Sequence, residues 1–140
     1  VYLRRFFLNF NSITAQNFFK LIRDEEKELF FEKYGKLRSV FDQLKREIKA
    51  EFILVYGSYA RMQATKESDI DVLIVGNVRN KEKVKEIFVS LDVDVSLKFE
   101  SLRDFGRRKD DALHRQILKE GVVIFDEGEF FDRVQSNTKY

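Results

Sequence analysis

The sequence predicts an α/β (α+β) domain in which helices flank a small mixed β-sheet, and three observations predict it. The first 50 residues carry apolar side chains at helical spacing. After residue 50, short apolar runs typical of buried strands alternate with helical segments. The chain has 140 residues, enough for one domain with a hydrophobic core.

The composition excludes several classes of protein. Hydrophobic residues make up 44% and charged residues 36% of the chain, which fits a folded globular protein rather than a disordered one. The chain has no cysteine, which excludes a disulfide framework and a thiolate metal site. The apolar runs are too short to span a membrane, and Arg4 and Arg5 interrupt the N-terminus, unlike a signal peptide. We therefore expect a cytoplasmic protein without a membrane partner.

The charge balance does not indicate a nucleic-acid partner. The net charge is +2, from 26 basic and 24 acidic residues. A protein that binds nucleic acid through its overall charge is usually far more basic.

Two helices are expected before residue 50. Ser12 or Asn11 can cap a helix from about Ile13 to Phe31, and Tyr34-Gly35 reads as its stop. A second helix then places five apolar residues on one face: Leu37, Val40, Phe41, Leu44 and Ile48.

Phenylalanine is concentrated in this helical part, where eight of the fifteen Phe residues precede residue 42. Core packing is one interpretation. The other is an exposed aromatic face for self-association or for a partner, which would make the chain a homo-oligomer through its N-terminal helices.

The strands are expected after residue 50. Phe52 to Tyr56 is an apolar run typical of a buried strand, and Ile70 to Val75 is another, interrupted only by Asp71. Asn80 can cap a helix that runs to about Ser90. Leu91 to Phe99 alternates strictly between apolar and polar residues and predicts a strand with one buried face.

The C-terminal part predicts one more helix and one more strand. A helix from about Asp111 to Glu120 is expected to end at Gly121, in the position of a C′ glycine. Val122 to Phe125 is a last short apolar run and predicts the final strand.

The stretch ILVYGSYARMQATKESDIDVLIV, residues 53–75, carries the residues with the most specific chemistry. Gly57 follows the first buried strand and has no Cβ, so a phosphate can approach the backbone closely there. Ser58 adds a hydroxyl donor. Arg61, three residues further on, can reach the same anion.

Two aspartates open the next apolar run. Asp69 and Asp71 are spaced by one residue, so on a strand their carboxylates converge on one face. Like charges this close repel unless a cation lies between them, and ligands that are all oxygen suit Mg²⁺ or Mn²⁺. Asp94 adds a third carboxylate if its strand is the neighbour. Three carboxylates and two divalent cations form a net positive site that can hold a triphosphate and stabilise an in-line displacement at phosphorus.

Each motif alone has a simpler interpretation. A Gly-Ser pair is most often a turn, and an Asp-x-Asp is most often part of a solvated surface. Asp92 shares the polar face of Asp94, so this pair can form a solvated edge. The conjunction of both motifs beside buried strands, with a third acidic strand following, favours the catalytic interpretation.

The segment GSYARMQATKESDIDVLIV resembles the signature of the nucleotidyltransferase superfamily that includes DNA polymerase beta, and above all its minimal nucleotidyltransferases. That signature is Gly-Ser, ten residues, then Asp-x-Asp, usually within GSYARGxAxxxSDIDLLV. The matching positions are Gly57, Ser58, Tyr59, Ala60, Arg61, Ala64, Ser68, Asp69, Ile70 and Asp71. The segment VDVSL, 93–97, resembles the strand of the third carboxylate, and LHRQILKEGVVIF resembles the last helix and strand.

The resemblance implies the nucleotidyltransferase fold, preceded here by extra N-terminal helices, and an enzyme that transfers a nucleoside monophosphate. It implies ATP or another nucleoside triphosphate at Gly57, Ser58, Arg61 and Ser68. It implies two Mg²⁺ ions held by Asp69, Asp71 and Asp94, with Asp94 also helping to deprotonate the attacking hydroxyl. A frequent partner in this family is an all-helical HEPN protein, and the minimal enzyme then acts as the antitoxin of a toxin–antitoxin system, in some cases by adding AMP to the partner.

One position departs from the family pattern. Met62 stands where the pattern usually has glycine after Ala-Arg. If that glycine serves a turn with positive φ or a close approach of triphosphate, Met62 weakens activity. If it only starts an exposed loop, Met62 is neutral.

The resemblance also divides the chain. Residues 1–35 are expected to be an N-terminal helical extension, similar to the connector of a winged-helix domain, and residues 36–140 the nucleotidyltransferase domain. Two rival functions stay open: a catalytically weak binding module that neutralises a partner by direct contact, and a DNA-binding regulator.

Three further features have less specific signals. His114 is the only histidine and is expected on a helix near the basic run Arg107–Lys109. This run is interpreted as a solvated loop, with a contact to phosphate or to an acidic partner as the alternative. The acidic residues Asp126, Glu127 and Glu129 can join the metal site only if the last strand ends nearby.

Overall fold

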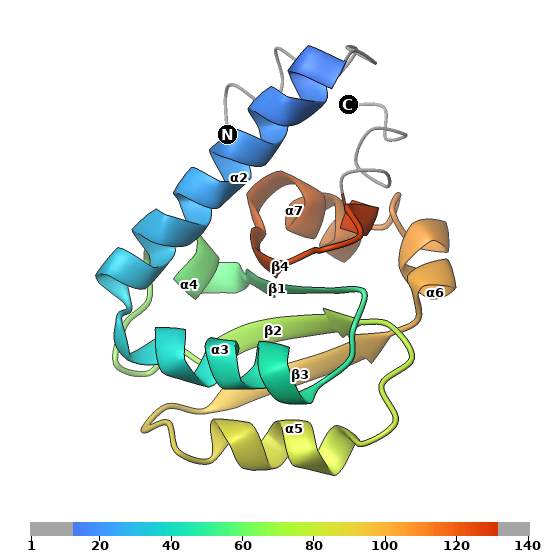
Figure 1. Ribbon diagram of the computed structural model, residues 1–140. Helices are drawn as coiled ribbons and strands as arrows, with labels where there is room; N and C mark the ends of the chain where they lie inside the picture. The colour runs from blue at the N-terminus through green and yellow to red at the C-terminus, as the bar shows by residue number, and fades with distance from the viewer. Residues whose placement is uncertain (1–12, 132–140) are drawn as a thin grey trace.

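The computed structural model describes residues 13–131. It contains a four-stranded mixed sheet with helices on both faces, which confirms the fold class expected from the sequence (Figure 1). The strands lie in the order β3-β2-β1-β4. Their bounds are β1, Phe52–Tyr56; β2, Ile70–Val75; β3, Val95–Glu100; and β4, Val122–Phe125.

Six helices of the described part surround this sheet. Their bounds are α2, Ile13–Lys33; α3, Lys36–Glu47; α4, Gly57–Ala60; α5, Lys81–Phe88; α6, Leu102–Arg107; and α7, Ala112–Glu120. Helices α3 and α5 pack on one face of the sheet and α6 and α7 on the other, while α2 lies against β4 (Figure 1). In this part of the chain no helix has both the length and the apolar character needed to cross a membrane.

Alternation along the strands creates two separate cores. Ile53, Val55 and Val72 face α3 and α5, where they meet the apolar face of α3 that the sequence predicted. Leu54 and Leu73 face the other way, toward α6 and α7. Because β1 and β2 are buried on both faces, their sequences are apolar runs rather than alternating ones, interrupted in β2 only by Asp71.

The strand directions bring four chain segments to one end of the sheet. β1 is antiparallel to β2 and to β4, and β2 is parallel to β3. The C-terminus of β1, which leads into Gly57, therefore lies beside the N-termini of β2, β3 and β4. We call this the Gly57 end of the sheet.

One predicted strand is shorter than expected. The alternating segment from Leu91 predicted a strand through Phe99, but β3 begins only at Val95. The ladder starts where the Ile70 N–H donates to the Asp94 carbonyl at 2.9 Å, and β2 offers no partner before Ile70. Leu91 and Val93 still pack against the core. The alternating pattern before Val95 therefore reflects the burial of these side chains and not the pairing of a strand.

The expected helix boundaries are mostly confirmed. α2 ends at Lys33, just before Tyr34-Gly35, and Asn80 caps α5 by accepting from the Lys83 N–H at 3.1 Å. Gly121 follows α7 but has φ −62°, so it is not a left-handed C′ glycine. A Cβ at Gly121 would instead lie 2.6 Å from the Ile117 carbonyl oxygen, which makes glycine necessary there. The predicted caps Asn11 and Ser12 lie outside the described residues.

The described phenylalanines of the helical part support core packing rather than an exposed aromatic face. Phe30, Phe31 and Phe41 are buried, with Phe30 and Phe31 5.3 Å apart between ring centroids. Phe18 and Phe19 are half-buried. Self-association through residues before 13 stays a prediction, because these lie outside the described part.

The histidine belongs to a buried network, whereas the basic run beside it is solvent-exposed, as the sequence predicted: the side chains of Arg107 and Arg108 are 65% and 53% exposed. His114 on α7 is 2% exposed, and its Nε2 lies 2.8 Å from the carboxylate of Glu100, itself 6% exposed. The His114 Nδ1 lies 2.7 Å from Asp111, and Arg108 approaches Glu100 at 3.4 Å. Arg107 ends α6 and pairs with Asp104 at 2.9 Å. No local sequence pattern predicts this network, because Glu100 and His114 are 14 residues apart.

Candidate active site

Position 57 requires glycine for two reasons, its backbone conformation and the closeness of Asp71. Its φ is +73°, a left-handed value that L side chains rarely adopt. A Cβ at this position would also overlap the Asp71 carboxylate. The Gly-Ser turn and Asp71 therefore touch, and two motifs that are separate in the sequence form one site.

The aspartate pair lies at the start of β2, at the Gly57 end of the sheet. Asp71 pairs with Tyr56 across the sheet, and Asp69 precedes the first residue of β2. Burial raises the pKa of the Asp71 carboxyl, the charge of Asp69 raises it further, and the Arg61 guanidinium lowers it. Negative charge is thus concentrated here, as the sequence predicted, and is only partly offset by Arg61.

Asp94 immediately precedes the neighbouring strand, β3. Ile70 and Val95 are paired in register, so Asp69 and Asp94 immediately precede the paired ends of β2 and β3. The carboxylate of Asp94 does not, however, form a compact triad with the other two. Among residues 13–131, no three His, Cys, Asp or Glu side chains lie close enough together to enclose a metal ion.

The donors present still fit Mg²⁺. This ion is usually held by one or two carboxylates together with oxygens of the substrate phosphates, rather than by a cage made of protein alone. Asp69 and Asp71 supply two such carboxylates beside an open glycine turn. The acidic tail does not contribute, because β4 runs away from the Gly57 end, with Phe125 opposite Ile53. Asp126 instead accepts from the Phe130 N–H at 2.8 Å.

The polar groups of the glycine turn have different surroundings. The Ser58 hydroxyl has no hydrogen-bond partner within the described part of the chain and is free to meet an anion. Ser68 is occupied, because its Oγ accepts from the Thr65 N–H at 2.9 Å and holds the loop that leads to Asp69. Ser68, one residue before the aspartate pair, therefore stabilises this loop through its hydrogen bond to Thr65.

Arg61 pairs with a residue that the sequence did not single out. Its Nη1 lies 3.5 Å from an Oε atom of Glu120, the last residue of α7. The segment containing Glu120 was matched to the family only as a helix and strand. Its nearness to Arg61 depends on the pairing of β4 with β1, which the sequence does not specify.

Tyr56 is a second residue that sequence reasoning missed. It is half-buried directly opposite Asp71, and burial, followed by the Asp71 charge, raises the pKa of its phenol. Its place as the last residue of an apolar run, just before Gly57, was the available signal.

Met62 adopts the left-handed conformation. Its φ is +60°, and its carbonyl accepts a hydrogen bond of 2.6 Å from Lys33 Nζ of the α2 C-terminus. The family glycine at this position therefore matches a turn with positive φ, the first of the two alternatives raised by the sequence. Holding a side chain in this conformation costs roughly 1–2 kcal/mol.

Substitution at Met62 is expected to reveal this strain. Met62→Gly should be about 1 kcal/mol more stable than Met62→Ala, because both lose the same packing and only alanine keeps the strained φ. At Gln63, which follows and has no positive φ, the order should reverse, with Gln63→Ala the more stable. Urea unfolding of the four variants measures both differences in stability. If the alanine variant were the more stable one at both positions, a left-handed Met62 would be contradicted.

Gly57→Ala is expected to damage both fold and site. Strain at φ +73° and displacement of the Asp71 carboxylate together should cost about 2 kcal/mol or more, and nucleotide binding should fall with it. Gly106→Ala is the matched control, because a Cβ there meets nothing within 4 Å and alanine favours the α6 helix. If the unfolding midpoint of Gly57→Ala is not lower than that of Gly106→Ala, the close contact between Gly57 and the Asp71 carboxylate is refuted.

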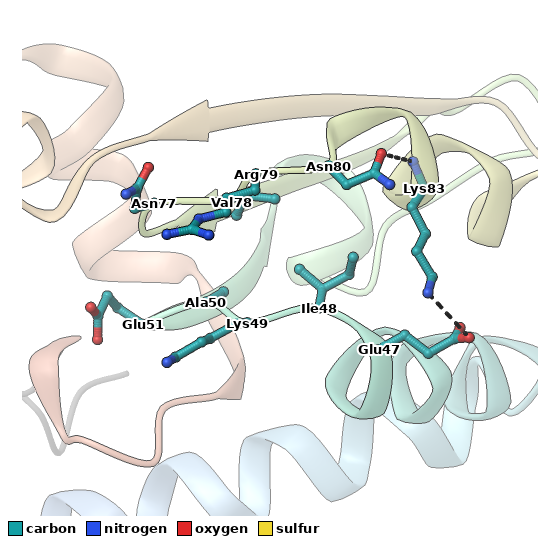
Figure 2. Close-up of a pocket in the computed structure, with 10 residues that line it drawn as sticks. All are labelled: Glu47, Ile48, Lys49, Ala50, Glu51, Asn77, Val78, Arg79, Asn80 and Lys83. Carbon is teal, nitrogen blue, oxygen red and sulfur yellow. Dashed lines mark hydrogen bonds and ion pairs between the residues drawn. The ribbon is translucent and has the colours of Figure 1, made fainter.

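A cavity of about 630 Å³ lies elsewhere, between the loops that precede β1 and follow β2 (Figure 2). Lys83 bridges to Glu47 across it at 3.8 Å, and Arg79 and Lys49 line it. Because β1 begins and β2 ends there, the cavity is at the opposite end of the sheet from Gly57. It is therefore not the pocket of the aspartate site.

Most of the chain matches a family of known proteins. Residues 36–130, which include every candidate site residue, match the family model described as "Polymerase beta, Nucleotidyltransferase". A curated protein of Methanocaldococcus jannaschii, named "Putative protein adenylyltransferase MJ0604", is 36% identical over 76 residues, covering 52% of this chain and 76% of that protein.

Two solved structures are similar at a lower level. The first is described as a toxin–antitoxin with AMP-PNP; its TM-score is 0.48 at 20% identity, covering 74% of this chain and 79% of that one. The second is a mutant of the toxin–antitoxin MntA-HpeT, with a TM-score of 0.47 at 17% identity, covering 72% and 79%.

Proposed function

Because the chain belongs to the polymerase beta nucleotidyltransferase family, we propose that it transfers AMP from ATP to a hydroxyl group of a partner protein. As a member of this family, the chain is a nucleotidyltransferase. The observation that carries the finer proposal is the contact between Gly57 and Asp71, which joins a phosphate-approach turn to a cation-binding carboxylate. A protein acceptor is supported by the name of the Methanocaldococcus relative.

In the proposed mechanism each residue has one role. The backbone at Gly57, the Ser58 hydroxyl and the Arg61 guanidinium bind the phosphates, and Asp69 and Asp71 hold Mg²⁺. When bound, Mg²⁺ polarises the phosphate and neutralises developing charge. The acceptor oxygen attacks the α-phosphorus, the bond to the β-phosphate breaks, and pyrophosphate leaves. Asp94, which immediately precedes β3, accepts the proton of the attacking hydroxyl.

The acceptor that we propose is a HEPN-type helical protein, with this chain as its antitoxin. This part of the proposal is supported by the resemblance of residues 57–71 to minimal nucleotidyltransferases. ATP is proposed as the donor because the relative is named an adenylyltransferase.

A binding module is the second candidate, and Met62 is the observation that favours it. A left-handed Met62 beside the phosphate turn is a departure from the glycine of the family pattern. As a binding module, the chain would neutralise its partner by direct contact, without catalysing nucleotidyl transfer.

The test uses α-labelled ATP, Mg²⁺, the full chain and a co-encoded HEPN-type protein. We expect label on the partner with wild type and none with Asp69→Asn/Asp71→Asn. Asp92→Asn is the control, since Asp92 is exposed and outside the site. If no acceptor is labelled and the double variant still co-purifies with and neutralises the partner, the enzyme proposal fails and the binding module is favoured.

A further inference from the structure

We propose that Glu120 is a positioning residue that holds the Arg61 guanidinium away from the aspartate pair and so keeps that pair open to a divalent cation. The inference rests on the proposed function, in which Asp69 and Asp71 bind Mg²⁺ and Arg61 binds phosphate. It assigns a role to a residue of the α7–β4 segment.

The fold brings Glu120 to the Gly57 end of the sheet. Val122, the first residue of β4, pairs with Val55 near the end of β1, and Glu120 lies two residues before it. Across this end, β3 and β2 begin beside Asp94 and Asp69, and β1 leads into the Gly57 turn. Glu120 completes this row on the β4 side, next to α4.

The contact is specific but leaves most of Arg61 free. Arg61 Nη1 and Glu120 Oε2 are 3.5 Å apart, with the two side chains 35% and 30% exposed. The Gln116 amide donates to the same Glu120 oxygen at 3.4 Å and fixes it from the previous helical turn. A guanidinium has five N–H donors, so one contact to Glu120 leaves others for phosphate oxygens.

Two carboxylates compete for Arg61. The Arg61 N–H donates to the Gly57 carbonyl at 3.2 Å, and Gly57 touches the Asp71 carboxylate, so Arg61 lies one helical turn from the residue that contacts the aspartate pair. Among the described residues, however, its only ion pair is with Glu120. Without Glu120, the guanidinium would be free to turn toward the Asp71 carboxylate, where it would compete with Mg²⁺.

The position of Glu120 is not explained by helix stability. A carboxylate in the last turn of a helix faces the partial negative charge of its terminal carbonyl groups, which is unfavourable. Glu120 is the final residue of α7, after the favourable Lys119. The pairing with Arg61 offsets this cost and gives a reason for an acidic residue here.

Removal of the Glu120 charge should weaken cation binding. Glu120→Gln preserves size and leaves an amide in place of the carboxylate, so Arg61 is released. We expect the dissociation constant for Mn²⁺, measured without nucleotide, to rise about three- to tenfold. Glu120→Asp, which keeps the charge, should recover part of the affinity.

The experiment titrates the full chain with Mn²⁺ alone and follows free Mn²⁺ by electron paramagnetic resonance. Wild type, Glu120→Gln, Arg61→Gln and the double variant form a cycle. If Glu120 acts through Arg61, its substitution should have no effect in the Arg61→Gln background. Glu127→Gln is the charge control, because this exposed residue pairs with Lys45 at 4.0 Å and does not contact Arg61.

Three outcomes overturn the inference. Glu120→Gln that binds Mn²⁺ as tightly as wild type refutes a positioning role. An equal weakening in the Arg61→Gln background would show that Glu120 acts only through its long-range charge. Wild type that binds no Mn²⁺ overturns the proposed metal site and the inference together, whereas the first two outcomes leave the proposed function intact.

Discussion

Asp71→Asn is expected to abolish nucleotidyl transfer while raising the stability of the folded protein. Activity should fall by more than about 100-fold, because even the outer-shell partners of metal ligands contribute about 10- to 100-fold. Stability should rise because the environment of Asp71 in the folded chain disfavours the charged form of its carboxylate. Burial and the nearby Asp69 charge both raise the Asp71 pKa, and asparagine removes the charge at nearly constant shape.

The sign of the pH dependence follows from this raised pKa. A carboxyl whose pKa is higher in the folded state contributes stability at low pH, which is lost as the pH rises through the folded pKa. The wild type should therefore lose stability relative to Asp71→Asn between acidic and neutral pH. Thermal unfolding of both proteins at about pH 4 and about pH 8 measures the difference, which should be larger at the higher pH.

The control for Asp71→Asn is Asp92→Asn, which removes the same charge from an exposed position. It should leave both activity and the unfolding midpoint close to wild type. If Asp71→Asn unfolds below wild type at neutral pH, the favourable charge of Arg61 outweighs the burial and repulsion, and our account of the site electrostatics is wrong.

Much of the fold was predictable because the burial of the central strands is visible in their own sequences. Phe52–Tyr56 and Ile70–Val75 are apolar on both faces except at Asp71, and β1 and β2 have these same bounds. The apolar face of α3 was equally visible, since Leu37, Val40 and Leu44 recur at helical spacing. In these segments, local pattern and tertiary environment agree.

The parts that were not predictable depend on partners distant in the chain. β3 begins at Val95 because β2 provides no ladder before Ile70, which no alternation within 91–99 can reveal. The proximity of Arg61 and Glu120 spans 59 residues and requires the pairing of β4 with β1. The motif did identify the aspartates, because their chemistry is contained in one short segment.

Met62 shows the same limit at a single residue. The sequence indicated that a glycine of the family pattern is replaced, and two consequences were open. Only the backbone angle of +60° distinguishes them. A local departure from a motif can therefore be recognised from sequence, but its energetic meaning depends on a dihedral angle fixed by the surrounding turn.

His114→Leu is expected to be the most destabilising single substitution that we consider. Both ring nitrogens of His114 face carboxylate oxygens, at 2.8 Å for Glu100 and 2.7 Å for Asp111. Loss of the ring would leave the Glu100 carboxylate buried, with only Arg108 at 3.4 Å as a partner. Removing one member of a buried pair costs about 3–5 kcal/mol, a large part of the stability of a small domain.

A double variant separates charge burial from packing. In Glu100→Met/His114→Leu, no buried charge is left unpaired, and apolar replacement of a whole buried pair is often neutral. Asp111 is half exposed and can be solvated by water. We therefore expect the double variant to recover most of the stability lost in His114→Leu, as measured by urea unfolding. A double variant no more stable than the single one would show that ring packing against Phe105, 5.4 Å away, is the larger effect.

The location of this network adds a functional expectation. Glu100 pairs with Val75 at the end of the sheet opposite Gly57, so the network does not contact the aspartate pair. His114 nevertheless lies on α7, whose last residue is Glu120. At a temperature where it is folded, His114→Leu should keep the Mn²⁺ affinity of wild type if α7 stays docked through Ile117 and Leu118. A weakened affinity comparable to that of Glu120→Gln would indicate that the buried pair sets the position of α7, and through it the position of Arg61.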